Sequence, residues 1–313
     1  MKDVTAMKEI KPQRLQKGDT IGIISPASPP DVKNLERSFS FLEQLGLKYK
    51  VGNHVYAQNG YLAGEDDERL KDLQEMFLDQ EVKAIFCAGG GYGTGRIAAQ
   101  IDYELIRNHP KIFWGYSDIT FLHTAIRQKT GLVTFHGPML ASDLGKEHAD
   151  EWSKKYVSQL FEPQELRYPE HLSKLETIVS GTAEGELIGG NLCLITSTLG
   201  TAFEVDTKGK LLLLEDIHEE PRNVDRMLNQ LQMAGKLDDA AGFIIGDFND
   251  CEPKREASLT LEEVIDYYIQ KTNKPAVKGF KIGHCSPHFS VPLGVKAVLH
   301  ADQKEFIIEN GVI

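Results

Sequence analysis

In the first half of the chain, short apolar runs alternate with segments in which apolar residues recur every three or four positions. The first run, TIGIIS at residues 20–25, has the length of a buried strand, and Asp31 can then cap a helix with an apolar face. This alternation predicts a parallel, doubly wound sheet whose ligands lie beyond the carboxyl ends of the strands. The predicted strands are residues 20–25, LKYKV around residue 49, residues 83–87, residues 111–115 and LVTF around residue 133.

The second half of the chain has a different pattern. Between Ala141 and about Ser180 the sequence becomes charged and irregular, which is typical of a linker. Beyond it, predicted helices near Asn191 and Val224 mix with strands in no regular order, so we expect an α+β arrangement. The strands predicted there are residues 183–188, 211–214, 242–245 and 278–282. We predict an N-terminal domain at 1–150, a linker at 151–178 and a C-terminal domain at 179–313.

The length of 313 residues also favours two domains, because single cores rarely grow that large. The polar stretch 1–20 lacks the apolar segment of a secretory signal, and no run approaches the ~20 apolar residues that span a bilayer. The cysteines are widely spaced and form no CxxC pair, so we expect reduced thiols and a cytoplasmic protein. They are Cys87, Cys193, Cys251 and Cys285.

The charge balance limits the choice of partner. Lysine and arginine number 35 against 46 aspartate and glutamate residues, a net charge of −11, and no dense basic tract is present. Nucleic acids and anionic membranes need clustered positive charge. We therefore expect neither as a partner.

The segment FWGYSDITFLHTAI contains the most informative serine. An apolar strand ends at Gly115, Ser117 occupies the turn, and the next residue opens a helix. In a nucleophile elbow such a turn exposes the serine oxygen, and the amide of Asp118 points toward a developing oxyanion. The usual G-x-S-x-G pattern is incomplete, because Ile119 replaces the last glycine. The alternative is a serine that only caps the helix.

The segment AGGGYGTGR follows an earlier predicted strand and offers backbone amides unobstructed by side chains. It can serve as a phosphate cradle, as an oxyanion-hole loop or as a plain turn. It lacks the Lys-Ser/Thr ending of a P-loop, and Gly93, Gly95 and Ala98 fit the dinucleotide pattern only loosely. The segment alone does not decide between these roles.

Two later segments supply partners for a nucleophile. Glu215 ends the apolar run LLLLE, where a buried carboxylate needs a hydrogen bond or an ion pair, although a strand-terminal glutamate can also face water. His284 follows the apolar run VKGFKIG in a loop rich in Gly, Ser and Pro, a typical setting for a catalytic base. His288 is the rival base.

Five motifs occur in a fixed order along the chain: GGYG at residues 90–93, GYSDIT, EGELIGGNL at residues 184–192, LLLEDI and GHCSPHFSVPLG. Together they resemble the LD-carboxypeptidases, the serine peptidases also called muramoyl-tetrapeptide carboxypeptidases, whose relatives include microcin C immunity peptidases. The resemblance extends from about Lys11 to the C-terminus.

The resemblance implies a triad of Ser117, His284 and Glu215, with an oxyanion hole from the amides of Gly91 and Asp118. It also implies an α/β fold, with a flavodoxin-like N-terminal parallel-sheet domain and a smaller barrel-like α+β C-terminal domain, in a homodimer. The implied reaction removes the C-terminal D-alanine from murein tetrapeptides in cell-wall recycling and requires no metal or cofactor.

An exopeptidase needs a cation or an amide cluster for the free carboxylate of its substrate. Arg96, Arg222 and Asn191 are the candidates, although either arginine can equally form a surface ion pair. One departure from the family pattern is visible, because Gly89 stands where many members have arginine before GGYG. It leaves the oxyanion hole intact but removes any substrate contact that this arginine makes.

Three other functions remain as alternatives. In a metal-dependent hydrolase, Glu215, His218, His284 and His288 would be the ligands, although the H-x3-H spacing lies in a proline-containing loop rather than on a helix. A muropeptide sensor would not need the triad. An immunity-type peptidase acting on an aminoacyl-nucleotide would need an aromatic platform for the base, and Trp152 is the one suggestive residue.

Overall fold

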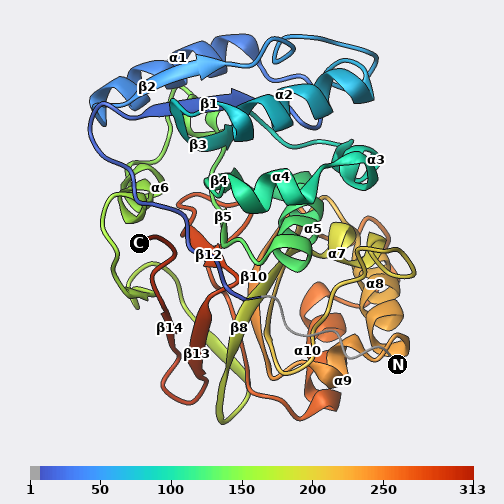
Figure 1. Ribbon diagram of the computed structural model, residues 1–313. Helices are drawn as coiled ribbons and strands as arrows, with labels where there is room; N and C mark the ends of the chain where they lie inside the picture. The colour runs from blue at the N-terminus through green and yellow to red at the C-terminus, as the bar shows by residue number, and fades with distance from the viewer. Residues whose placement is uncertain (1–7) are drawn as a thin grey trace.

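A computed structural model describes residues 8–313, and its first layer is a six-stranded sheet that runs from β2 near the top of Figure 1 to β12 near the centre. Five strands are parallel, and β12, from far along the chain, pairs antiparallel with β5 at the edge. The spatial order is β12 (Val291–Leu293), β5 (Thr134–His136), β4 (Ile112–Gly115), β3 (Val82–Cys87), β1 (Thr20–Ile24) and β2 (Lys48–Val51).

Helices cover both faces of this sheet, as expected for a doubly wound arrangement. Helix α1 packs on one face through Leu35 and Leu42, and its predicted cap is present, because Asp31 Oδ1 accepts the amide of Asn34 at 2.8 Å. The other helices contribute to the apolar cluster on the opposite face. Their bounds are α1 (Val32–Gln44), α2 (Asp66–Leu78), α3 (Thr94–Ile97), α4 (Tyr103–Asn108) and α5 (Thr120–Thr130).

The second sheet has eight strands and curls into a half-barrel. Its four central strands, β8 to β11, are parallel, and antiparallel strands flank them on both sides. The spatial order is β6 (Leu166–Arg167), β14 (Glu305–Ile308), β13 (Lys296–His300), β8 (Thr182–Asn191), β9 (Leu211–Ile217), β10 (Gly242–Asn249), β11 (Ala276–Lys278) and β7 (Glu176–Val179).

The two sheets share one apolar core. Helices α7 to α10 cover one face of the second sheet, on the right in Figure 1. On its other face, Leu213 of β9 belongs to the same apolar cluster as Trp114 of β4. Ser117, just after β4, and Glu215, near the end of β9, therefore lie close together. The helices are α7 (Leu192–Ser197), α8 (Pro221–Met233), α9 (Lys236–Asp239) and α10 (Leu261–Thr272).

The structure confirms the α/β class, the parallel N-terminal sheet and the curled C-terminal sheet. The predicted strand at 278–282 is wrong, because β11 ends at Lys278 and Gly279 has a φ of +98°. Residues 279–282 still run beside β10, where Asp247 donates its amide to the carbonyl of Ile282 at 2.9 Å. The segment 151–178 contains a short helix, α6 (Glu151–Lys155), as well as β6.

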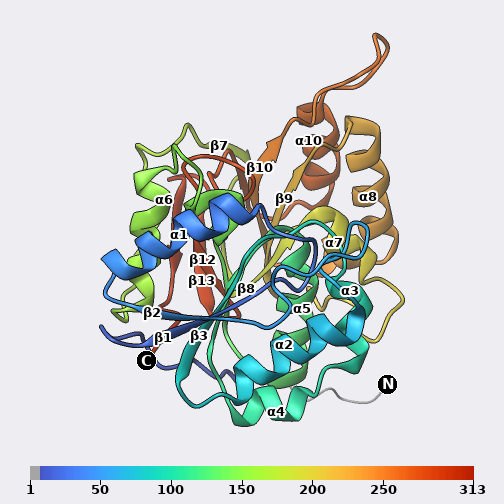
Figure 2. The same cartoon turned by 90° about the horizontal axis from the view of Figure 1, so that it is seen from above.

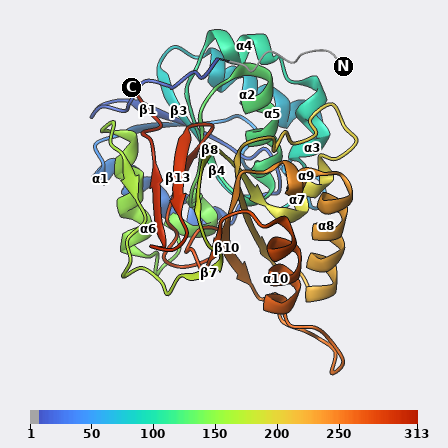
Figure 3. The same cartoon turned by 90° about the horizontal axis from the view of Figure 1, so that it is seen from below.

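Two further features concern the surface of the molecule. The exposed residues 252–260 form a loop between β10 and α10 that projects from the body in Figures 2 and 3. Over residues 8–313, no helix combines the length and the apolar composition needed to cross a membrane.

We predict that protonation of His123 destabilises the fold at mildly acidic pH. His123 on α5 is buried with Nε2 2.8 Å from the carbonyl oxygen of Gly115, and burial lowers the pKa of His123 to about 4. The unfolded histidine, with a pKa of about 6.5, binds the proton first, so stability is lost as the pH falls from about 6.5 toward 4. Between about pH 7.5 and pH 5, this residue should contribute about 2 kcal/mol to the loss of unfolding free energy.

Urea unfolding at these two pH values tests the expectation. His123→Gln should remove that share of the pH dependence, whereas His171→Gln, at an exposed position, should not. An unchanged pH dependence in His123→Gln would contradict this account.

Candidate active site

Ser117 lies in a tight turn between a strand and a helix. β4 ends at Gly115, Ser117 has a φ of 63°, and the turn of helix Ser117–Ile119 leads into α5. A positive φ is unusual outside glycine and marks a position that the surrounding structure enforces. This strand, turn and helix have the geometry of a nucleophile elbow, which exposes the serine oxygen.

The turn closes without the second glycine of the usual elbow pattern. Ile119, at that position, is fully buried. A Cβ built on Gly115 would lie 3.0 Å from Cγ1 of Ile119 and 3.1 Å from Cβ of Cys87. The missing side chain at Gly115 therefore leaves the space into which Ile119 packs.

His284 connects the serine to a carboxylate. Its Nε2 lies 3.0 Å from Oγ of Ser117, and its Nδ1 lies 2.7 Å from Oε2 of Glu215. Ser117 follows the first sheet, whereas Glu215 lies in β9 and His284 follows β11 of the second sheet. The structure thus brings the three residues into one hydrogen-bonded chain across both sheets.

The carboxylate of Glu215 has no exposed surface. Its Oε2 faces His284, and its Oε1 has no hydrogen-bond partner within residues 8–313. Gly283 has a φ of +120°, and a Cβ built there would lie 2.5 Å from Oε2 of Glu215. The close approach of Glu215 to His284 therefore requires glycine at position 283. A buried carboxylate needs a partner to stay charged, and His284 supplies it.

The two histidines of the loop differ in their electrostatic setting. Burial acts to lower the pKa of His284, whereas the charge of Glu215 and its hydrogen bond act to raise it. The second effect is larger, so the pKa of His284 lies above its usual value. His288 is only 2% exposed, and burial lowers its pKa to about 3. Its ring packs on Tyr116 at a centroid distance of 4.8 Å. Only His284 of these two forms a hydrogen bond with Ser117.

The glycine-rich loop lies directly against the serine. A Cβ on Gly90 would lie 3.1 Å from Oγ of Ser117, and one on Gly91, with a φ of +107°, would lie 2.2 Å from Oγ of Ser28. Across the part of the chain that the structure describes, the amide of Gly91 donates no hydrogen bond to protein. The amide of Asp118 opens a helix, where backbone donors lack intrahelical partners. Both amides can therefore face a developing negative charge.

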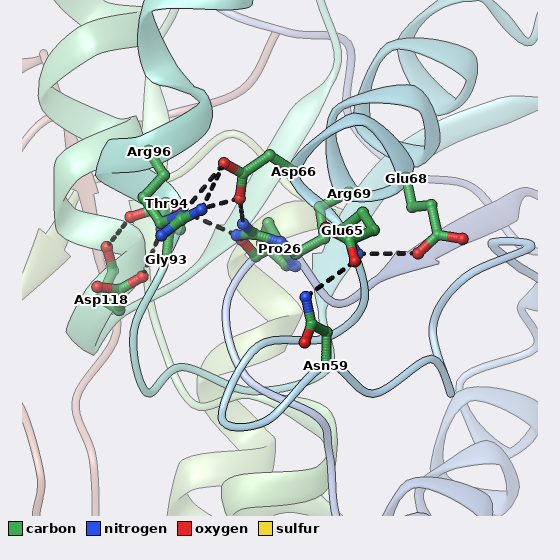
Figure 4. Close-up of polar contacts among 10 residues, drawn as sticks. All are labelled: Pro26, Asn59, Glu65, Asp66, Glu68, Arg69, Gly93, Thr94, Arg96 and Asp118. Carbon is green, nitrogen blue, oxygen red and sulfur yellow. Dashed lines mark hydrogen bonds and ion pairs between the residues drawn. The ribbon is translucent and has the colours of Figure 1, made fainter.

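A polar network holds the glycine-rich loop in place at Gly93, as Figure 4 shows. Arg69 is buried and donates to the carbonyls of Pro26 at 2.8 Å and Gly93 at 3.0 Å, and it also pairs with Asp66. Arg96 binds the same Asp66 through contacts of 2.9 to 3.1 Å. Arg96 thus helps to support the loop. It lines neither of the two cavities at the triad, one beside Ser117 and one beside His288.

A second link joins the loop to the elbow. The carboxylate of Asp118 accepts the amide of Thr94 at 2.9 Å, and the hydroxyl of Thr94 donates to the carbonyl of Asp118 at 2.6 Å. Asp118 is buried, and burial raises the pKa of its carboxyl. These bonds fix the loop and the elbow relative to each other.

The other two predicted substrate contacts also lie elsewhere. Arg222 is exposed at the start of α8 and pairs with Glu220 at 3.2 Å. Asn191 is buried, caps α7, and donates from Nδ2 to Asp216 Oδ1 at 2.8 Å. Neither residue lines either of the two cavities at the triad.

Of the four ligands of the metal hypothesis, Glu215 and His284 are in contact, but the other two do not join them at one point. His218 is exposed and lies 3.6 Å from Asp250, whereas His288 is buried against Tyr116. Within the described residues, no group of three or more His, Cys, Asp or Glu side chains has a metal-binding arrangement. The metal-dependent alternative therefore has no geometric support.

Trp152 does not provide a platform at the site. Its ring packs at a tilt against that of His171, with a centroid distance of 5.5 Å, and the ammonium of Lys155 lies 4.7 Å from the centre of the Trp152 ring. It does not line either of the two cavities at the triad. The aminoacyl-nucleotide alternative gains no support from this residue.

Two cavities meet at the triad, of about 420 Å³ beside Ser117 and about 540 Å³ beside His288. Residues that sequence reasoning missed line both of them. The ring of Tyr116 packs at a tilt against that of His284, with a centroid distance of 4.8 Å, and its hydroxyl donates to Asp143 Oδ1 at 3.1 Å. Lys146 borders both cavities. Tyr116 directly precedes the serine, which was a usable signal, whereas Asp143 and Lys146 fall in irregular sequence without one.

Comparisons with known proteins identify the family to which this sequence is similar. Models of the LD-carboxypeptidase N-terminal and C-terminal domains match residues 21–137 and 184–299. The chain is 61% identical over 303 residues to the probable murein peptide carboxypeptidase of Bacillus subtilis, with 96% of this chain and 95% of that protein covered. It is 32% identical over 294 residues to the murein tetrapeptide carboxypeptidase of Pseudomonas aeruginosa, with 90% and 94% covered.

A solved structure, that of MccF in complex with glutamyl sulfamoyl guanosine, matches with a TM-score of 0.89 at 25% identity, covering 97% of this chain and 99% of that chain. The two family models together account for most of the chain. An elbow serine, a histidine and a buried glutamate in hydrogen-bonded order are what a serine peptidase requires. The chain therefore belongs to the LD-carboxypeptidase family.

Proposed function

We propose that this chain is a serine LD-carboxypeptidase that removes the terminal D-alanine from murein tetrapeptides. The observation that carries the proposal is the chain of contacts from Glu215 through His284 to Ser117, at 2.7 and 3.0 Å, in a member of this family. The name of the 61% identical relative, a probable murein peptide carboxypeptidase, supports the substrate class.

In the proposed mechanism, Ser117 Oγ attacks the carbonyl carbon of the terminal peptide bond while Nε2 of His284 takes its proton. Glu215 holds the imidazole in the required tautomer and stabilises the imidazolium. The amides of Gly91 and Asp118 receive the oxyanion. The C–N bond then breaks, and His284 returns the proton to the leaving amine. Water, activated by the same histidine, hydrolyses the acyl-enzyme and restores Ser117.

We also propose that the enzyme works as a homodimer in the cytoplasm. The dimer rests on the family resemblance. The cytoplasmic setting is supported by four free thiols, the state that a reducing compartment maintains. With a net charge of −11, a small murein peptide is a more suitable partner than nucleic acid.

We predict that Ser117→Ala abolishes turnover without loss of the fold, because the side chain occupies an accessible turn. His284→Ala should reduce the single-turnover rate as severely, since members of a triad act as a unit, and the double variant should match either single one. His288→Ala should be milder, because its ring forms no hydrogen bond with Ser117. Mass spectrometry of the released D-alanine and tripeptide gives the rates.

Unfolding curves for the four variants provide the control for folding. If His288→Ala is inactive while His284→Ala turns over, the base has been assigned to the wrong histidine. Near-wild-type turnover in Ser117→Ala would exclude the serine mechanism.

We predict that Gly91→Ala lowers kcat by about 100-fold or more, the range seen when one oxyanion donor is lost. The added Cβ would lie 2.2 Å from Ser28 Oγ at a φ of +107°, so the loop must shift and take the amide with it. Gly209→Ala is the matched control, because Gly209 also has a positive φ of +68° but no neighbour within 4 Å. Equal kcat values for both folded variants would argue against Gly91 as an oxyanion donor.

A further inference from the structure

We propose that the ammonium of Lys146 binds the free terminal carboxylate of the peptide and thereby makes the enzyme an exopeptidase. This inference deepens the proposed function and rests on it. A different residue is needed for this contact, because the three candidates from the sequence bind other protein groups and line neither cavity. These candidates are Arg96, Arg222 and Asn191.

Lys146 has the right position relative to the nucleophile. The leaving residue separates the scissile carbonyl from the terminal carboxylate, and one residue spans roughly 3.5 Å. The carboxylate must therefore lie in the cavity that Ser117 borders. Among the described residues that line this cavity, Lys146 is the one lysine or arginine, and it also borders the neighbouring cavity.

The ammonium of Lys146 is available for a ligand. Over residues 8–313, Nζ of Lys146 forms no ion pair and no hydrogen bond with the protein. Of the nearby carboxylates, Asp31 accepts the amide of Asn34 at the start of α1. Asp143 is buried to a large extent and accepts from Met139 at 2.8 Å and from Tyr116 at 3.1 Å. Burial raises the pKa of the Asp143 carboxyl and the charge of Lys146 acts to lower it, but the two groups form no ion pair within 4 Å among the described residues.

The other lysine at the site is already paired. Lys281 borders only the larger cavity, and its ammonium lies 3.3 Å from Oδ1 of Asp247. A carboxylate that bound Lys281 would have to compete with Asp247. Lys146 has no ion pair of this kind among the described residues, so it is the stronger site for an anion.

The backbone that carries Lys146 is held in place. The carbonyl of Gly145 accepts Nη1 of Arg37 at 2.8 Å, and its amide donates to the carbonyl of Leu140 at 2.7 Å. A Cβ on Gly145 would lie 1.9 Å from the carbonyl oxygen of Asn34, so this turn packs against α1 without a gap. The base of the lysine side chain is therefore fixed, while its exposed end can reach the ligand.

The negative net charge of the protein makes a cation at the substrate site important for binding an anionic peptide. The protein carries a net charge of −11, so an anionic peptide approaches against a repulsive field unless a local cation offsets it. A charge-assisted hydrogen bond from an ammonium to a carboxylate discriminates against an uncharged analogue. Lys146 would thus select peptides with a free C-terminus near the scissile bond.

The test compares a murein tetrapeptide with its C-terminal amide, which lacks the charge but keeps the scissile bond. Lys146→Met should lower kcat/KM for the free acid by roughly 10- to 100-fold and change that for the amide by less than about threefold, so that the preference for the acid is lost. Lys146→Arg should retain most of the preference. Lys271→Met on α10 removes the same charge far from the site and should behave as wild type.

The outcomes separate the two proposals. A wild-type enzyme that releases no D-alanine from the tetrapeptide would overturn the proposed function and this inference with it. A wild-type enzyme that cleaves the tetrapeptide but shows no preference for the acid, or a folded Lys146→Met variant that keeps the preference, would overturn the role of Lys146 alone.

Discussion

A carboxylate without solvent contact, that of Glu215, lies where the two sheets meet. Burial of a lone charge of this kind is strongly unfavourable, and its partner is the imidazole of His284 at 2.7 Å. Gly283 makes the approach feasible, because any side chain there would collide with the carboxylate. The raised pKa of His284 follows from the same pair, and so does its orientation toward Ser117.

The topology keeps this pair aligned with the serine. After the loop with His284, the chain enters the first sheet as β12, where Val291 pairs with His136 of β5. The loop is thus tied to β10 of one sheet at Ile282 and to β5 of the other at Val291. Because the core is continuous between the sheets, the elbow and the loop cannot move apart without exposing apolar surface.

Features encoded in contiguous sequence could be predicted, such as the alternation behind the first sheet and the elbow around Ser117. The grouping of Ser117 with His284, 167 residues away, came from family resemblance, since spacing alone does not join such distant positions. The residue that binds the terminal carboxylate of the substrate could not be predicted. Whether an arginine is available for that role depends on which protein carboxylate it contacts in the fold. Arg96, for example, contacts Asp66, which lies 30 residues away in the sequence. Lys146 lies in charged, irregular sequence that gave no signal of a site.

The most direct test of the central claim is to find which atom of the enzyme becomes covalently modified. A fluorophosphonate reacts with a serine only when a neighbouring base activates it. Peptide mapping by mass spectrometry should find a single adduct, on Ser117, whose formation is suppressed by saturating murein tetrapeptide. An enzyme that hydrolyses the tetrapeptide but carries its adduct on another residue, or carries none, would contradict the account.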